Sequence, residues 1–133
     1  MIRCIPFIFA MLFLVAEPAL ADQQVIELLR LSVPANQREV WMEGERSTWQ
    51  PWLEAQDGFL GREIFWDAGK AEGLVLVRWA SRELWKAISD EEVQRVQERF
   101  DSRVNMSLGR RSNDASPFPL LEAKELLPQR LSD

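Results

Sequence analysis

Apolar and polar residues alternate along two neighbouring runs in the middle of the chain, Phe59–Trp66 and Leu74–Trp79. The polar link between them, Asp67–Gly73, contains two glycines. A period of two is typical of β-strands, and a short link with glycine joins such strands into an antiparallel hairpin. Two further short apolar runs, Val25–Val33 and Leu120–Leu126, are bounded by polar residues or proline. The pattern therefore predicts four strands.

Apolar positions spaced by three and four residues predict two helices. The first covers Ala35–Gln56, and we expect it to kink or restart near Ser47–Gln50 because Pro51 has no amide hydrogen to donate. The second begins at the capping box Ser89–Glu92, and a short helical turn, Arg82–Ala87, precedes it. The apolar stripe of the second helix consists of Val93, Val96, Phe100 and Val104.

The elements follow one another as strand, helix, strand, strand, helix, strand, which is the split βαβ pattern of a ferredoxin-like domain. We therefore predict an α+β fold, βαββαβ, with an antiparallel four-stranded sheet. Its first and third strands are expected in the centre, parallel to one another. Both faces of the sheet are mostly apolar, and the helices of one chain cover only one face. We expect a second copy to cover the other face, which makes the protein a homodimer.

The first 21 residues have the pattern of a secretory signal peptide, with Arg3, the apolar run Ile5–Ala16 and a small-x-small site ending at Ala21. The apolar run is about 12 residues long, whereas a membrane-spanning helix needs about 20. Cleavage before Asp22 is therefore favoured over retention as an anchor. The sequence predicts export to the periplasm, the thylakoid lumen or the cell exterior, with membrane contact only through the uncleaved leader. One domain covers 22–127, and 128–133 form a tail.

The residue types that are missing exclude several kinds of chemistry. The chain has no histidine and no tyrosine, and its one cysteine, Cys4, lies in the leader. Disulfides, zinc, copper or iron sites built on histidine or cysteine, and catalytic triads are therefore excluded from the exported domain. The net charge of −5 argues against nucleic-acid binding. We predict no metal site and no cofactor.

Charged side chains inside the predicted strands need partners if they are buried. Alternation places Glu27, Glu63 and Arg78 on one face of the sheet. We therefore expect an ion network in which Arg78 pairs with Glu27 or Glu63. The alternative to a catalytic role, which we favour, is that these charges belong to the interface between subunits or lie exposed at strand ends.

Six tryptophans are many for a chain of this length. One interpretation places some of them around a flat aromatic ligand between the helices and the sheet. The other, which we favour, makes them core or interface filler. Under the first interpretation the pocket candidates are Trp79, Trp66, Arg62, Arg30 and Trp85. The two arginines are expected on the face of Trp66 and Trp79, where they would meet an anionic group.

Three runs, FLGREIFWD, LVLVRWASRELWKAI and EEVQRVQERFD, resemble the antibiotic-biosynthesis-monooxygenase-like domains of the dimeric α/β-barrel superfamily. The likeness covers about Val25–Asp101. It is greatest to an uncharacterised bacterial subgroup, best known from cyanobacteria, with the signature RW-x-S-R-E-x-W-K-A-I. That signature is carried here by Arg78, Trp79, Ser81, Arg82, Glu83, Trp85, Lys86, Ala87 and Ile88.

The resemblance implies a homodimer whose two sheets pack into a barrel. Some members of the superfamily are cofactor-independent oxygenases of polycyclic aromatics, and others degrade haem with an asparagine, a tryptophan and a histidine. Trp79 matches that tryptophan, but the first strand has no asparagine and the chain has no histidine, which disfavours haem degradation. We expect an exported dimer that binds a small hydrophobic or aromatic ligand or acts structurally. The alternative is a cofactor-independent monooxygenase-like enzyme for an aromatic substrate.

Overall fold

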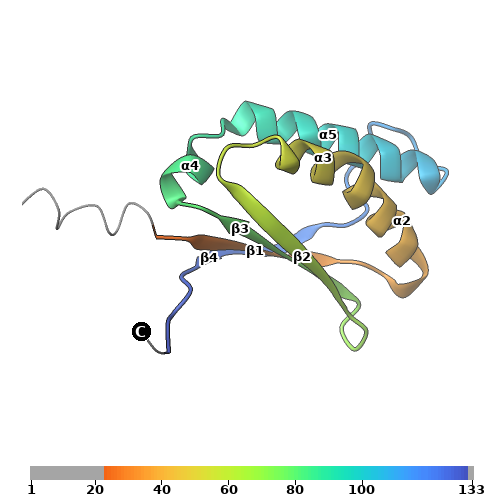
Figure 1. Cartoon of the computed structure of the whole chain (residues 1–133). Coiled ribbons are helices and arrows are strands. Elements are labelled where there is room, and N and C mark those ends of the chain that lie inside the picture. The colour runs from red at the N-terminus through yellow and green to blue at the C-terminus, as the bar shows by residue number, and fades with distance from the viewer. Residues whose placement is uncertain (1–22, 132–133) are drawn as a thin grey trace, which may run out of the picture.

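A computed structural model describes residues 23–131, in which helices lie on one face of a four-stranded sheet (Figure 1). The predicted leader, 1–21, lies outside the described residues. Within 23–131, no helix has the length and apolar character needed to cross a membrane.

The strands are β1 (Val25–Ser32), β2 (Phe59–Asp67), β3 (Glu72–Trp79) and β4 (Leu120–Leu126), in the order β2-β3-β1-β4. The α+β ferredoxin-like fold and the central position of β1 and β3 are confirmed. The expectation that β1 and β3 are parallel was wrong, because every neighbouring pair is antiparallel. The helical crossover makes β2 run in the direction of β1, and the hairpin then reverses the chain.

The first helical segment is one continuous run made of η1 (Ala35–Gln37), α2 (Arg38–Gly44), η2 (Glu45–Trp49) and α3 (Gln50–Glu54). η2 is a π-helical turn, in which the amide of Gln50 donates to the carbonyl of Glu45. It coincides with the irregularity predicted before Pro51, because proline cannot continue the regular ladder.

The second helical segment, on the same face of the sheet, contains α4 (Arg82–Lys86) and α5 (Asp90–Ser107). Ser81 Oγ accepts a hydrogen bond from the amide of Leu84 at 3.1 Å and caps α4. Ser89 Oγ accepts one from the amide of Glu92 at 3.2 Å and caps α5, as the capping box predicts.

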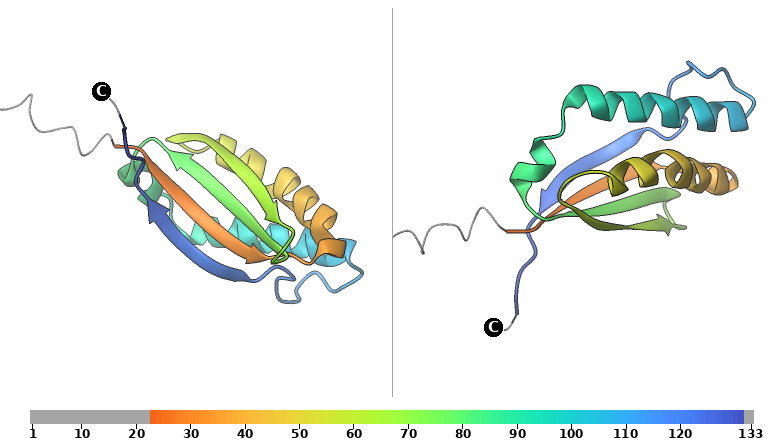
Figure 2. Two further views of the ribbon diagram at one scale, coloured as in Figure 1. Left: turned by 90° about the horizontal axis from the view of Figure 1, so that it is seen from below. Right: turned by 45° about the horizontal axis from the view of Figure 1, so that its top comes forward.

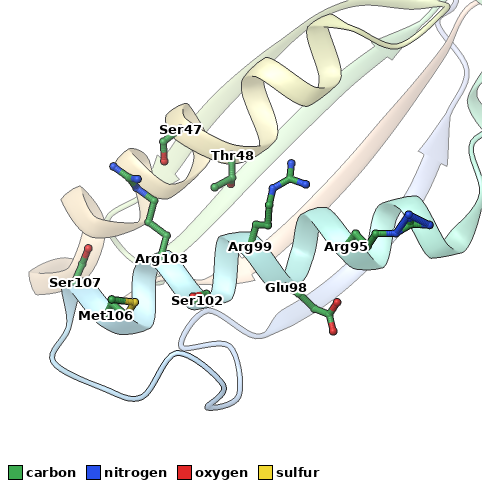
Figure 3. A pocket seen from close by; sticks show the side chains of 9 residues that line it. All are labelled: Ser47, Thr48, Arg95, Glu98, Arg99, Ser102, Arg103, Met106 and Ser107. Atoms are coloured by element: carbon green, nitrogen blue, oxygen red, sulfur yellow. The ribbon is translucent and has the colours of Figure 1, made fainter.

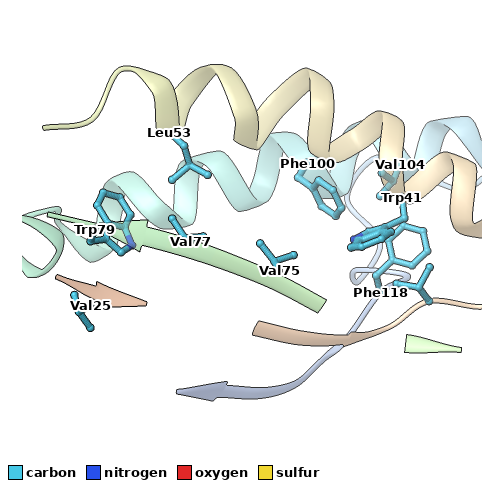
Figure 4. Close-up of a cluster of buried hydrophobic side chains, with 10 residues drawn as sticks. Val25, Trp41, Leu53, Val75, Val77, Trp79, Phe100, Val104 and Phe118 are labelled. Carbon is cyan, nitrogen blue, oxygen red and sulfur yellow. The ribbon is translucent and has the colours of Figure 1, made fainter. Parts of the chain in front are cut away.

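The core lies between the helices and one face of the sheet (Figure 4). Leu53 points from α3 toward Val77 on β3. The indole of Trp41 lies directly on Gly73, where an added Cβ would come within 2.5 Å of the ring. Glycine is therefore needed at this position of β3 so that the large side chain can reach the sheet.

The register of β1 corrects one sequence-based assignment. Glu27 pairs with Val77 and Ile26 pairs with Arg78, so Glu27 lies on the helix-covered face and Arg30 on the uncovered one. Alternation alone had predicted the reverse, with Glu27 on the face of Glu63 and Arg78 and with Arg30 on the face of Arg62. Alternation defines the two faces of each strand, but only pairing relates the faces of two strands that no hairpin joins.

Within residues 23–131, no helix or strand covers the other face of the sheet (Figure 2). Its apolar side chains come from all four strands: Ile26, Leu28, Phe65, Leu74, Leu76 and Leu126. Phe65 is 50% exposed. The charges of this face are paired with one another, Arg30 with Glu72 at 2.8 Å and Arg78 with Glu63 at 3.0 Å.

Candidate functional site

A cavity of about 640 Å³ lies between the covered face of the sheet and the helices. Four tryptophans line it: Trp49, Trp52, Trp79 and Trp85. Aliphatic side chains of the central strands are also part of its lining: Leu29, Leu31, Val75 and Val77. A mostly apolar hollow of this size with a few polar groups is typical of small-molecule sites.

A larger hollow of about 910 Å³ lies between α5 and η2, and Figure 3 shows Arg99 and Arg103 extending from α5 toward the helix that carries Ser47 and Thr48. Its lining is dominated by exposed polar and charged side chains. Arg103 Nη2 already donates to Glu43 Oε1 at 3.0 Å. This hollow is a solvated groove, and the tryptophan-lined cavity is the better candidate for a site.

Glu27 is the acidic group on the sheet side of the cavity. Its Oε1 accepts a hydrogen bond from Trp79 Nε1 at 3.2 Å, and no second donor reaches the carboxylate from the described residues. Burial raises the pKa of Glu27, and the Trp79 hydrogen bond and the positive charge of Lys86 oppose that rise. A carboxylate with one donor retains the capacity to accept further hydrogen bonds from a ligand.

The aromatic lining is held by contacts between rings. Trp79 and Trp85 stack with their centroids 6.5 Å apart and an interplanar angle of 14°. Lys86 Nζ lies 3.9 Å from the ring centroid of Trp85. Trp49 and Trp52 meet edge to face at 5.7 Å. These contacts fix the orientation of the indoles around the cavity.

Arg62 and Glu45 form a buried ion pair in the lining, with side chains 4% and 7% exposed. The guanidinium donates to Glu45 Oε1 at 2.5 Å, to Gln50 Oε1 at 2.6 Å and to the carbonyl of Glu45 at 3.1 Å. Burial raises the pKa of Glu45 in spite of the attraction of Arg62. Arg62 therefore ties the π-helical turn to β2.

Arg62 and Glu27 flank the same residue of β3, because both pair with Val77. Two strand spacings separate their backbones, roughly 10 Å. Two polar groups of opposite charge thus lie on either side of an apolar strip of the sheet.

The predicted pocket candidates are only partly brought together. Trp79, Trp85 and Arg62 line the cavity. Trp66 does not, because its Nε1 donates to the carbonyl of Val33 at 3.1 Å and its ring lies under Arg38. Arg30 lies on the uncovered face, where it pairs with Glu72 and Glu122.

The predicted ion network is divided in the same way. Arg78 and Glu63 pair, and both side chains are about half exposed. Glu27 belongs to the cavity and not to this network. Sequence reasoning missed Glu45 and Lys86 as lining residues, and it had no pattern that could relate either to the sheet. Glu27 could be singled out from the sequence because it is an acidic residue among the apolar residues Val25, Leu29 and Leu31.

Glu27→Gln is expected to raise the free energy of unfolding at neutral pH by about 0.5–2 kcal/mol. Glutamine keeps an acceptor for the Trp79 N–H but carries no desolvated charge. Since burial raises the pKa of Glu27 in the folded state, the wild type loses stability as the pH rises through that pKa. The stability gain of the variant should therefore shrink as the pH is lowered toward the ordinary glutamate pKa of about 4.3. Urea denaturation across this pH range measures it, and an equal gain at every pH would contradict the explanation.

Within residues 23–131, no group of three or more histidine, cysteine, aspartate or glutamate side chains is arranged to hold a metal ion.

No protein-family model matches the chain, and no curated protein matches it. Several solved structures, however, are similar to the chain. The ActVA-Orf6 monooxygenase of Streptomyces coelicolor, in complex with nanaomycin D, is 16% identical, with a TM-score of 0.59 over 84% of this chain and 92% of that chain. Rv0793 of Mycobacterium tuberculosis is 14% identical, with a TM-score of 0.53 over 83% and 99% of the two chains. SnoaB, a cofactor-independent oxygenase from Streptomyces nogalater, is 11% identical, with a TM-score of 0.52 over 84% and 99%.

Identities this low show the fold alone. The chain has the fold of the antibiotic-biosynthesis-monooxygenase-like domains, as the resemblance predicted.

Proposed function

We propose that the protein binds a small, largely apolar aromatic molecule in the tryptophan-lined cavity. The observation that carries the proposal is Glu27, a desolvated carboxylate that receives one hydrogen bond from the described residues, in a hollow lined mainly by aromatic and aliphatic side chains. The volume of about 640 Å³ falls in the range of ligand pockets, about 300–1,000 Å³. The nanaomycin D complex of the S. coelicolor protein, which has the same fold, supports an aromatic ligand.

A titration with 2-naphthalenemethanol, followed by calorimetry, tests ligand binding. Leu29→Trp fills the cavity from β1 and is expected to weaken binding at least about 10-fold, a loss of roughly 1.4 kcal/mol. Leu28→Trp is the matched control, because the neighbouring residue of β1 lies on the uncovered face. Absence of binding to the wild type, or an equal loss in both variants, would reject the proposed site.

A second candidate function is cofactor-independent oxygenation, favoured by the raised pKa of Glu27 inside the cavity. A raised pKa makes a carboxylate a stronger base. In such a reaction an activated CH₂ group and O₂ give a C=O group and water. The substrate supplies the electrons, and one oxygen atom enters the product. Oxygen uptake with anthrone tests this function, and uptake that is unchanged in Glu27→Gln would remove Glu27 from it.

We further propose an exported homodimer formed through the uncovered face of the sheet. The leader pattern supports export, and the apolar strip from Ile26 to Leu76 across the central strands supports the dimer. The charges around this strip are paired within each copy, so a second copy would meet few unpaired groups. A surface that is apolar and internally neutral suits self-association.

A further inference from the structure

We propose that the preferred ligand of the cavity is a hydrophobic ammonium ion and that anionic aromatics are excluded. The inference rests on the proposed binding function and concerns the charge of the ligand. Two features of the lining support it: its balance of charges and the incomplete hydrogen bonding of Glu27 among the described residues.

The charged side chains of the lining are mostly acidic. Four carboxylates, those of Glu27, Glu45, Asp90 and Asp101, are accompanied by two cations, Arg62 and Lys86. A net negative lining favours cations and raises the free energy of a bound anion, most strongly where water is excluded.

The arginine of the lining does not offer a free anion site. Nε, Nη1 and Nη2 of Arg62 all donate to protein acceptors, namely Gln50, the Glu45 carboxylate and the Glu45 carbonyl. A carboxylate ligand at Arg62 would have to compete with Glu45, which is already buried against it. The pair is neutral as a unit, so the remaining charges of the lining are three carboxylates and Lys86.

Lys86 is already engaged at the edge of the site. Its ammonium lies over the ring of Trp85, and Trp85 stacks on Trp79. This contact shows that the tryptophan cluster accepts a cation on an indole face. A ligand ammonium in the cavity would lie among aromatic side chains and donate to the second oxygen of Glu27, which no donor from the described residues reaches.

Three ligands with one ring system and different charges test the inference: 2-naphthylmethylammonium, 2-naphthalenemethanol and 2-naphthoate. Calorimetry at neutral pH should give an ammonium affinity at least about 10-fold above that of the alcohol, with the carboxylate weakest. Glu27→Gln should remove the advantage of the ammonium over the alcohol. Asp101→Asn should reduce the advantage by a smaller factor, because Asp101 already accepts a hydrogen bond from Gln97.

Glu63→Gln is the matched control, since Glu63 lies on the uncovered face, and it should leave all three affinities unchanged. Equal affinities for the three ligands, preference for 2-naphthoate, or an ammonium advantage that survives in Glu27→Gln would overturn the inference while the binding function stands. Binding of none of the three would instead reject the binding function, and the inference with it.

Discussion

Arg62→Met is expected to lower the free energy of unfolding by about 3–5 kcal/mol at neutral pH. The substitution leaves Glu45, whose side chain is 7% exposed, without its cation. It also removes the donors to Gln50 and to the carbonyl of Glu45 in the π-helical turn. A domain of this kind is stable by about 5–15 kcal/mol, so the loss is a large part of the total. Chemical denaturation followed by circular dichroism measures it.

Two variants separate the lost pair from a general effect of methionine. Arg95→Met removes the exposed partner of Glu91 on α5 and should cost less than about 1 kcal/mol. Arg62→Met combined with Glu45→Leu should recover most of the loss, because no unpaired charge remains buried. A double variant as unstable as the single one would show that the hydrogen bonds of Arg62, and not the charge of Glu45, dominate.

Leu76→Glu is expected to convert the proposed dimer to a monomer and to raise the dissociation constant of that dimer roughly 100-fold or more. Leu76 lies on the uncovered face of the central strand β3, opposite Leu28. In a two-fold dimer both copies would bury the new carboxylate, and each unpaired buried charge costs several kcal/mol. Every 1.4 kcal/mol corresponds to a tenfold change in the constant. Analytical ultracentrifugation at micromolar concentrations measures the change.

The control for this prediction is Met106→Glu, which introduces the same charge on α5 at a side chain that is 64% exposed. It should remain dimeric. A wild-type protein that is monomeric at tens of micromolar would contradict the dimer itself. Retention of the dimer in Leu76→Glu would instead move the interface away from the centre of this face.

The order of elements, their approximate bounds and the helix caps could be predicted because each depends on neighbours in sequence. Alternation defined the hairpin, and the capping residues Ser81 and Ser89 lie three residues from the amides they satisfy. Proline at position 51 indicated the irregular turn that the structure shows as η2. Periodicity and capping are local effects, so one sequence carries them.

The composition of the cavity depends on contacts between distant parts of the chain. Trp79 and Glu27 are 52 positions apart, and their hydrogen bond follows from the register of β1 against β3. Alternation alone had placed Glu27 on the wrong face, since a shift of one residue in register exchanges the two sides of a strand. The pairing of Arg62 with Glu45 likewise depends on how the π-helical turn packs on β2.

The sequence by itself thus determined the α+β fold, the two-sided apolar sheet and the absence of histidine from any site. Only the tertiary structure decided which face the helices cover, and therefore that Glu27 lies among tryptophans while Arg30 does not. The physical reason is that hydrophobic periodicity specifies the faces of each element separately. Packing, such as Trp41 against Gly73, decides which faces meet.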